Sequence, residues 1–294
     1  MGRRRNAAAP PPRPPQREAG SNVTTYDTIA IGAGPGGNAT VEQIALRGGR
    51  ACLVECDDIG GTCVNRGCMP SKALLAASEA YWRMGHPGEL GIPTADPPEV
   101  DGAALCRRVH DVVRTLSGGL ADKLEQLDGV DIVRGRARLL GPGRVEIRHG
   151  SAVRTLTART ITIATGARPA RPAFAPDGSR RVITSREAFQ ADALPRRGIV
   201  LGGSILGCEF ATAYSELGVE TTVLEMSDRL LPMLDEDAGR AVRESLAARG
   251  ATVRTGTRVE GVSDVGHCVE ARLEGGETLQ ADVLLLAVGR RANL

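Results

Sequence analysis

The stretch TYDTIAIGAGPGG, residues 25–37, decides the fold, because it predicts a β-strand that runs directly into a glycine turn. In Gly32-x-Gly34-x-x-Gly37 the first glycine permits a tight bend, and the second lets a pyrophosphate approach the backbone. The third lets helix and strand pack closely. Residues 40–46 then have helical composition, and RACLVE (50–55) predicts a second buried strand. This order predicts a dinucleotide-binding βαβ unit.

A bound dinucleotide would place its phosphates at the N-terminus of the helix after this turn. Free backbone N–H groups and the helix dipole favour anions there. Glu55 closes the second strand 18 residues after Gly37, where a carboxylate can bind the diol of a ribose. The candidate ligands of the unit are Gly32, Gly34, Pro35, Gly36, Gly37 and Glu55.

The same pattern recurs 170 residues later, in RRGIVLGGSILGCEF (196–210) and VETTVLE (219–225). Ser204 takes the middle glycine position, and its small side chain would weaken or adjust nucleotide binding rather than abolish it. Glu225 favours NAD with a free 2′-hydroxyl, whereas a 2′-phosphate would favour arginine. Arg229 nearby keeps NADP as a minor alternative, and a turn without ligand is the other. The candidate residues here are Gly202, Gly203, Ser204, Gly207 and Glu225.

The rest of the chain predicts the elements around these two units. Residues 71–84, 101–127 and 235–249 have helical patterns. Between 130 and 163, short runs rich in Val, Ile and Thr and separated by Gly predict a small β-meander that ends in the strand of TITIATGARP (160–169). The predicted fold class is therefore α/β, with two Rossmann-like dinucleotide-binding domains.

Composition limits the classes of function. The 294 residues leave room for about two domains. The 37 basic and 35 acidic residues give a net charge of +2, which argues against a nucleic-acid partner. The sequence has no apolar run near the roughly 20 residues of a membrane span, so we expect no membrane partner.

Residues 1–22 are rich in Arg and Pro and have no apolar core. They predict a disordered leader rather than a signal peptide, with a basic organelle-targeting leader as the alternative. The seven cysteines are an odd number, which fits a reducing compartment, so we expect a cytoplasmic protein. Five stand alone and are expected as buried small side chains: Cys52, Cys56, Cys106, Cys208 and Cys268.

Two further cysteines lie five positions apart in GGTCVNRGCMPSK (60–72). An ideal helix separates such Cα atoms by about 8.6 Å, and a disulfide needs less than about 7 Å. Bonded Cys63 and Cys68 therefore cannot share one regular helix, and Cys63 is expected in an entering turn or in a distorted first turn, where the glycines supply the freedom. A helix N-terminus lowers thiol pKa, so the pair is expected to be reactive. Two unrelated buried thiols are the alternative.

The motifs GAGPGG, GGTCVNRGCMPSKALLAAS, ATGARP, GGSILGCEFA and VGRRAN occur in the order seen in the pyridine nucleotide–disulfide oxidoreductases. From about residue 26 to 294 the chain resembles this family, and most closely its dihydrolipoyl dehydrogenase branch of the cyanobacterial and plastid type. Glutathione reductase and mercuric reductase are the near alternatives. The resemblance implies an FAD-binding domain that includes the meander, with an NAD-binding domain inserted after it.

The resemblance also implies roles for single residues. The first turn and Glu55 would bind the ADP half of FAD, and the second turn and Glu225 would bind NAD. Cys68 would face the flavin as the charge-transfer thiol, and Cys63 would exchange with the substrate disulfide. Lys72 would pair with Glu209. Further cofactor contacts are implied at Gly61, Thr62, Lys72, Thr165, Gly166 and Gly289.

Members of this homodimeric family continue past the segment that matches residues 289–293, into a second FAD-contacting Gly-Asp segment and a dimerisation domain with a His–Glu pair. The four histidines of this chain do not map to that pair and are expected at the surface: His86, His110, His149 and His267. We therefore expect a leader over 1–22, an incomplete FAD-binding domain over 23–168, an NAD-binding domain over 169–294, and no dimerisation domain.

Two functions are compatible with this pattern. The first is an FAD-dependent dithiol/disulfide oxidoreductase that carries electrons from a dihydrolipoamide-type substrate, borne on a 2-oxoacid dehydrogenase complex, to NAD. On that interpretation the chain alone would bind FAD poorly and turn over little. The second is a truncated nucleotide-binding module without turnover.

Overall fold

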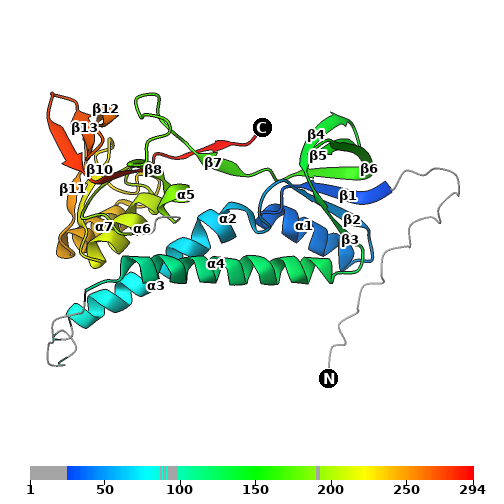
Figure 1. The fold of residues 1–294 in the computed structure, drawn as a ribbon, viewed down its shortest axis with the longest axis horizontal. Helices are drawn as coiled ribbons and strands as arrows, with labels where there is room; N and C mark the ends of the chain where they lie inside the picture. The colour runs from blue at the N-terminus through cyan, green and yellow to red at the C-terminus, as the bar shows by residue number, and fades with distance from the viewer. Residues whose placement is uncertain (1–24, 87, 89–90, 92–98, 190–192) are drawn as a thin grey trace, which may run out of the picture.

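The computed structural model describes residues 25–86, 88, 91, 99–189 and 193–294. Two α/β halves lie side by side, and two long helices, α3 (Cys68–Gly85) and α4 (Gly102–Glu125), run beneath them (Figure 1). The leader predicted over 1–22 lies outside the described residues. Within the described part, no helix is both long enough and apolar enough to cross a bilayer.

The first half is built on a six-stranded sheet in the order β3-β2-β1-β6-β5-β4. Its strands are β1 (Thr25–Ile31), β2 (Ala51–Glu55), β3 (Val130–Arg134), β4 (Arg136–Gly141), β5 (Arg144–His149) and β6 (Ala152–Ile163). The first three strands and β6 pair in parallel, and β4, β5 and β6 pair antiparallel. Helix α1 (Pro35–Ala45) connects β1 to β2, as the βαβ prediction requires.

One strand joins the parallel sheet to the meander. The N-terminal part of β6 pairs with β5, from Ala152 to Thr157, and its C-terminal part pairs with β1, from Thr157 to Ile163. The expectation that the meander begins at Val130 is wrong, because β3 pairs in parallel with β2 and buries Val133 in the same core. The meander is therefore β4 to β6 alone.

The second half contains a five-stranded parallel sheet in the order β11-β10-β9-β15-β8 and a three-stranded antiparallel sheet, β12-β13-β14. The parallel strands are β8 (Val182–Thr184), β9 (Arg197–Leu201), β10 (Glu220–Leu224), β11 (Thr252–Arg254) and β15 (Val283–Leu286). The antiparallel ones are β12 (Val259–Asp264), β13 (Val269–Leu273) and β14 (Thr278–Ala281). The helices are α5 (Ser185–Ala188), α6 (Ile205–Glu216) and α7 (Glu236–Ala248).

A two-stranded ribbon joins the halves. The chain leaves the first half through β7 (Ala167–Pro169) and comes back through β16 (Arg290–Ala292), which pairs antiparallel with β7 (Figure 1). The amide of Asn293 then donates to the carbonyl of Gly166 at 3.0 Å. The end of the described chain thus lies against the first half, although it comes after the second half in sequence.

Candidate functional site

The first glycine turn shows which glycines the fold itself requires. Gly32 has φ 103°, and a Cβ there would lie 2.3 Å from the carbonyl oxygen of Ala164. A Cβ on Gly37 would lie 1.8 Å from the carbonyl oxygen of Gly32. At Gly34, by contrast, a Cβ would have no atom within 4 Å. Packing within the protein demands the outer glycines, and the middle one leaves open space at the start of α1, which fits a phosphate.

The second turn repeats this geometry. A Cβ on Gly202, at φ 110°, would lie 2.5 Å from the carbonyl oxygen of Ala287, and one on Gly207 would lie 1.9 Å from that of Gly202. Ser204 has nearly the backbone of Gly34, with φ −74° and ψ 177° against −77° and −177°. The hydroxyl of Ser204 donates to the carbonyl of Ala287 at 3.0 Å, so the extra side chain is held by the protein.

Glu55 is bound more tightly by the protein than we expected. Its buried carboxylate accepts backbone N–H groups from Ala33 at 2.6 Å, Cys56 at 2.7 Å and Asp57 at 2.8 Å. An ionised carboxylate offers about four acceptor positions. One therefore remains for a ribose hydroxyl, and the main role of Glu55 is to close the turn.

Glu225 closes the second turn in the same way with one bond fewer. It accepts the N–H of Gly203 at 2.6 Å and that of Ser227 at 2.7 Å. Arg229 donates to the carbonyl of Pro232 at 3.3 Å. Two acceptor positions of Glu225 therefore remain for a ribose diol.

A polar cavity of about 340 Å³ opens beside Glu55, where the β3–β4 and β5–β6 turns meet. Three arginines and a histidine make it basic. Its lining is Glu55, Cys56, Arg134, Gly135, Arg136, Arg148, His149 and Gly150. No local pattern in the sequence marks this cavity, because its lining comes from segments that meet only when the sheet forms.

The segment that carries the paired cysteines sits directly on the first turn. The N–H of Gly60 donates to the carbonyl of Ala33 at 2.8 Å. A Cβ on Gly61, which has φ 58°, would lie 2.7 Å from Cα of Gly34. Two candidate residues of the cofactor site, Gly61 and Gly34, are thus in backbone contact.

Cys63 and Cys68 lie in two different helices, so the prediction that one regular helix does not hold both is confirmed. Cys63 is in α2 (Gly61–Arg66), Cys68 begins α3, and the chain breaks between them at Gly67, with φ −150° and ψ −106°. Of the two places expected for Cys63, the structure has no open entering turn but a short helical segment broken off from α3 at Gly67, which is nearer to the distorted first turn. The side-chain amide of Asn65 stabilises a short helix by donating to the carbonyls of Ile59 and Gly61, both at 3.0 Å.

Both cysteines are free thiols in this structure, Cys63 half-buried and Cys68 exposed. Burial raises the pKa of Cys63 to about 11, with the hydrogen-bonded Cys68 thiol adding to the rise and Lys72 opposing it. We expected the helix N-terminus to lower thiol pKa. At Cys63 burial outweighs that effect.

Lys72 and Glu209 form an ion pair between α3 and α6. The lysine is exposed, and the glutamate side chain is 19% exposed. The pairing implied by the resemblance is therefore present in the structure, and it joins the segment of the paired cysteines (60–72) to the helix that follows the second glycine turn.

The remaining candidates gather where the ribbon meets the segment of the paired cysteines. The hydroxyl of Thr165 donates to the carbonyl of Asn293 at 2.6 Å, and the carbonyl of Gly289 accepts the N–H of Ala170 at 2.9 Å. The guanidinium of Arg290 donates to the hydroxyl of Thr62 at 3.3 Å and to the carbonyl of Ala167. Sequence reasoning missed Arg290, because its partners are distant in the chain.

Several other residues differ from expectation. His86, His149 and His267 are exposed, but His110 is half-buried and its Nε2 lies 2.6 Å from the carbonyl oxygen of Phe189. Of the isolated cysteines, Cys52, Cys208 and Cys268 are buried as expected, whereas Cys56 is exposed and Cys106 is half-buried. Among the described residues there is no group of three or more His, Cys, Asp or Glu that could hold a metal ion.

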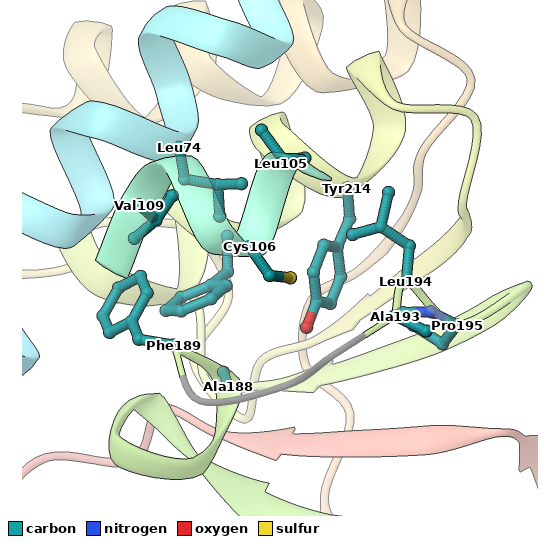
Figure 2. Close-up of a pocket in the computed structure, with 11 residues that line it drawn as sticks. Leu74, Leu105, Cys106, Val109, Ala188, Phe189, Ala193, Leu194, Pro195 and Tyr214 are labelled. Atoms are coloured by element: carbon teal, nitrogen blue, oxygen red, sulfur yellow. The ribbon is translucent and has the colours of Figure 1, made fainter. Parts of the chain in front are cut away.

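A small apolar pocket lies between α3, α4 and α6 (Figure 2). The side chains of Cys106 and Tyr214 project into it, and burial raises the pKa of Tyr214. Its free volume is about 30 Å³, room for a few water molecules at most. It is therefore a packing gap in the core and has no room for a cofactor.

Comparisons with known proteins agree with this geometry. The family model described as pyridine nucleotide-disulphide oxidoreductase matches residues 26–294. The chain is 39% identical to dihydrolipoyl dehydrogenase 3 of Pseudomonas aeruginosa, covering 92% of this chain and 59% of that protein. It is 37% identical to dihydrolipoyl dehydrogenase of Haloferax volcanii, covering 92% and 58%.

Solved structures show the same fold. LpdA from Mycobacterium tuberculosis matches with a TM-score of 0.80 at 29% identity, covering 90% of this chain and 58% of that one. The Cu(II) complex of the HOCl-induced flavoprotein disulfide reductase RclA from Escherichia coli matches with a TM-score of 0.80 at 25% identity, covering 92% and 57%. The chain thus spans less than two thirds of the length of these relatives.

Proposed function

Because the chain belongs to the pyridine nucleotide-disulphide oxidoreductase family, we propose that it is an FAD- and NAD-dependent dithiol/disulfide oxidoreductase of the dihydrolipoyl dehydrogenase type. The observation that carries this proposal is the contact between residues 60–72, the redox segment of the proposed enzyme, and the first glycine turn. The Gly60 amide binds Ala33, and Gly61 touches Gly34. The two thiols are therefore attached to the backbone that would hold the cofactor.

The first half fits FAD. The open space at Gly34 and the N-terminus of α1 would take the pyrophosphate, and the remaining acceptor position of Glu55 would take a ribose hydroxyl. Thr62 lies in α2, which begins at the contact with the turn, and Lys72 lies in the first turns of α3. When bound, FAD supplies a two-electron acceptor between the cysteine pair and the nicotinamide.

The second half fits NAD better than NADP. Glu225 keeps two acceptor positions for a ribose diol, and its negative charge would repel a 2′-phosphate. Arg229 is held by the carbonyl of Pro232. Titration of the chain with NADH and NADPH tests this preference, and tighter binding of NADPH would contradict it.

The chemistry of the cysteine pair is thiol–disulfide exchange. A substrate thiolate attacks one sulfur of the Cys63–Cys68 disulfide, which forms a mixed disulfide and releases the other cysteine as a thiolate. The second substrate thiol loses its proton and attacks the substrate sulfur of the mixed disulfide, which releases the first cysteine. The substrate leaves as a cyclic disulfide, and two electrons remain on the enzyme dithiol. Lys72 lies close enough to stabilise the Cys63 thiolate.

The relatives' names favour a dihydrolipoamide-type substrate. On this proposal a 2-oxoacid dehydrogenase complex presents the substrate in the cytoplasm.

The test of this substrate measures stoichiometry and needs no turnover. The chain is oxidised, its Cys63–Cys68 disulfide is confirmed by peptide mapping, and it is titrated with dihydrolipoamide or with glutathione. We expect about one equivalent of dihydrolipoamide to reduce the pair and glutathione to be far less effective, because only the dithiol closes a ring. Preferential reduction by glutathione would instead favour a glutathione reductase-like function. A Cys63→Ser variant is the control.

A further inference from the structure

Helices α3 and α6 each begin at a candidate site. Helix α3 starts at Cys68, and α6 starts directly after Ser204 of the second turn. The two helices pack against each other, one from each half. Their contact therefore sets where the redox segment lies relative to the second nucleotide turn.

Two sets of polar side-chain interactions, each called a tie below, join these helices. The Lys72–Glu209 pair lies near their N-terminal ends and is partly open to solvent. The second tie is centred on Glu216, the last residue of α6, whose side chain is only 2% exposed. Its carboxylate accepts the hydroxyl of Ser78, on α3, at 2.6 Å, and Nε of Arg249, which comes after α7, at 2.8 Å. Ser78 is itself fully buried.

The same arginine also contacts α3 directly. The guanidinium of Arg249 lies 5.7 Å from the ring centroid of Trp82, and Trp82 stacks on His86 with 3.7 Å between ring centroids. Trp82 is the single tryptophan of the sequence. The tie therefore has a fluorescent reporter of its own.

We propose that Glu216 is a positioning residue that fixes the register of α3 against α6, keeps Lys72 on Glu209, and so holds the Cys63–Cys68 segment in place relative to the second glycine turn. The consequence for electron transfer rests on the proposed function. The tie itself can be measured in the thiol form of the chain.

The physical reason is the cost of leaving a buried carboxylate without partners. The apolar side chains in this contact, such as Leu74 and Phe210, tolerate small shifts because hydrophobic contact has no direction. A buried carboxylate does not, since losing Ser78 leaves one buried oxygen without its hydrogen bond and losing Arg249 leaves the buried charge unpaired. Glu216 therefore allows one register where apolar packing would allow several.

The test uses two variants and a matched control. Glu216→Gln removes the charge that holds Arg249, and Ser78→Ala removes the α3 partner while leaving the ion pair with Arg249. The control is Glu79→Gln, because Glu79 is the residue after Ser78 on α3 but pairs at the surface with Arg83 of its own helix. The readouts are the emission of Trp82 and the pH profile of alkylation at Cys63, with the peptide identified by mass spectrometry.

Both variants are expected to change Trp82 emission and to open the half-buried Cys63. The charged and titrating groups that act on Cys63 are Cys68 and Lys72, so loosening α3 changes its surroundings directly. At pH values below the midpoint of this profile, the alkylation of Cys63 should be at least about threefold faster, which is the change that a fall of half a unit in its pKa produces. The Glu79→Gln profile should match the parent.

A change in Trp82 emission with an unchanged Cys63 profile would overturn the proposal, because Glu216 would then act only locally. If circular dichroism shows that Glu216→Gln does not fold, the Ser78→Ala profile decides by the same criterion. Failure to form a Cys63–Cys68 disulfide would defeat the proposed function and leave this test intact, because alkylation is measured on thiols.

Discussion

The two glycine turns differ less in their backbones than in the segments that rest on them. In both, a glutamate carboxylate accepts the amide after the first glycine at 2.6 Å, from Ala33 to Glu55 and from Gly203 to Glu225. In both, a backbone amide of a later loop donates to the carbonyl of that same residue, from Gly60 to Ala33 at 2.8 Å and from Leu231 to Gly203 at 2.9 Å. These two hydrogen bonds, which anchor each turn, have the same lengths in both units to within a tenth of an ångström.

The segments after this anchor are not duplicated. After Gly60 the first unit continues into α2 and the cysteine pair, whereas after Leu231 the second unit exposes Met233 and Leu234 before α7. Positions that close the backbone are the same in both units, and positions that face a ligand or carry chemistry have diverged. Substitutions at the two kinds of position test this division between fold and function.

The largest effects are expected at the glycines that both units share. Gly37→Ala and Gly207→Ala would place a Cβ at 1.8 and 1.9 Å from backbone oxygens, so each should destabilise its half by about 3 kcal/mol or more. Urea unfolding followed by circular dichroism measures this. Gly36→Ala is the matched control, because its nearest atom would be an ordinary contact at 3.7 Å. Equal tolerance of all three changes would refute the duplicated packing.

The closing glutamates should rank next and should differ from each other. Glu55→Ala strands three backbone N–H groups and Glu225→Ala strands two. We expect losses on the order of 1 to 3 kcal/mol, larger at Glu55, because each carboxylate satisfies one buried donor and Glu55 satisfies two further part-buried donors against one for Glu225. The same unfolding experiment gives both values. A larger loss at Glu225 would show that the hydrogen bonds do not set the order.

The middle positions should affect ligands more than stability. Gly34→Ser fills open space, so we expect a stability change below about 1 kcal/mol but at least about tenfold weaker FAD binding. Ser204→Gly should change NADH affinity less than about threefold, because the hydroxyl it removes already points at Ala287. Fluorescence titrations of both nucleotides test the pair. A large NADH effect at Ser204 would mean that its hydroxyl turns toward the ligand.

The smallest effect on stability is expected from the thiol that only the first unit carries. Cys63 has a folded pKa of about 11 against an ordinary 9.0, so the folded state holds this proton more strongly than the unfolded state. Its contribution is complete below pH 9.0 and is lost as pH rises through about 11. Urea midpoints of the parent and of Cys63→Ser, measured over this range, should converge at high pH. Parallel curves would contradict the raised pKa.

The elements that depend on a local sequence pattern could be predicted, whereas those that depend on pairing between strands could not. Both strand–turn–helix–strand units were identified, because each glycine and each closing acid lies in one short stretch. Residues 130–134 were assigned to the meander, because a short run rich in Val and Ile does not say which strand it will pair with. Glycines at both ends of residues 61–66 do not distinguish an entering turn from a short distorted helical turn, and the structure has the short helix α2 there.

The site was predictable in part for the same reason. The resemblance implied cofactor contacts at Gly61 and Thr62, and the structure brings Gly61 against Gly34 of the first turn and Thr62 next to Arg290 of the ribbon. Arg290 reaches Thr62 and Glu216 reaches Ser78 across 228 and 138 positions of sequence. No local pattern marks such contacts. They exist only once the ribbon and the helix pair have formed.

The central claim, that the segment on the first turn is a redox-active cysteine pair, is tested most directly by mapping the thiols of the mildly oxidised chain. We predict one intrachain disulfide between Cys63 and Cys68, which resists alkylation until mild reduction, whereas exposed Cys56 is alkylated from the start. If Cys63 and Cys68 are both alkylated after oxidation, the first turn carries two independent thiols, and the proposed disulfide oxidoreductase function is wrong.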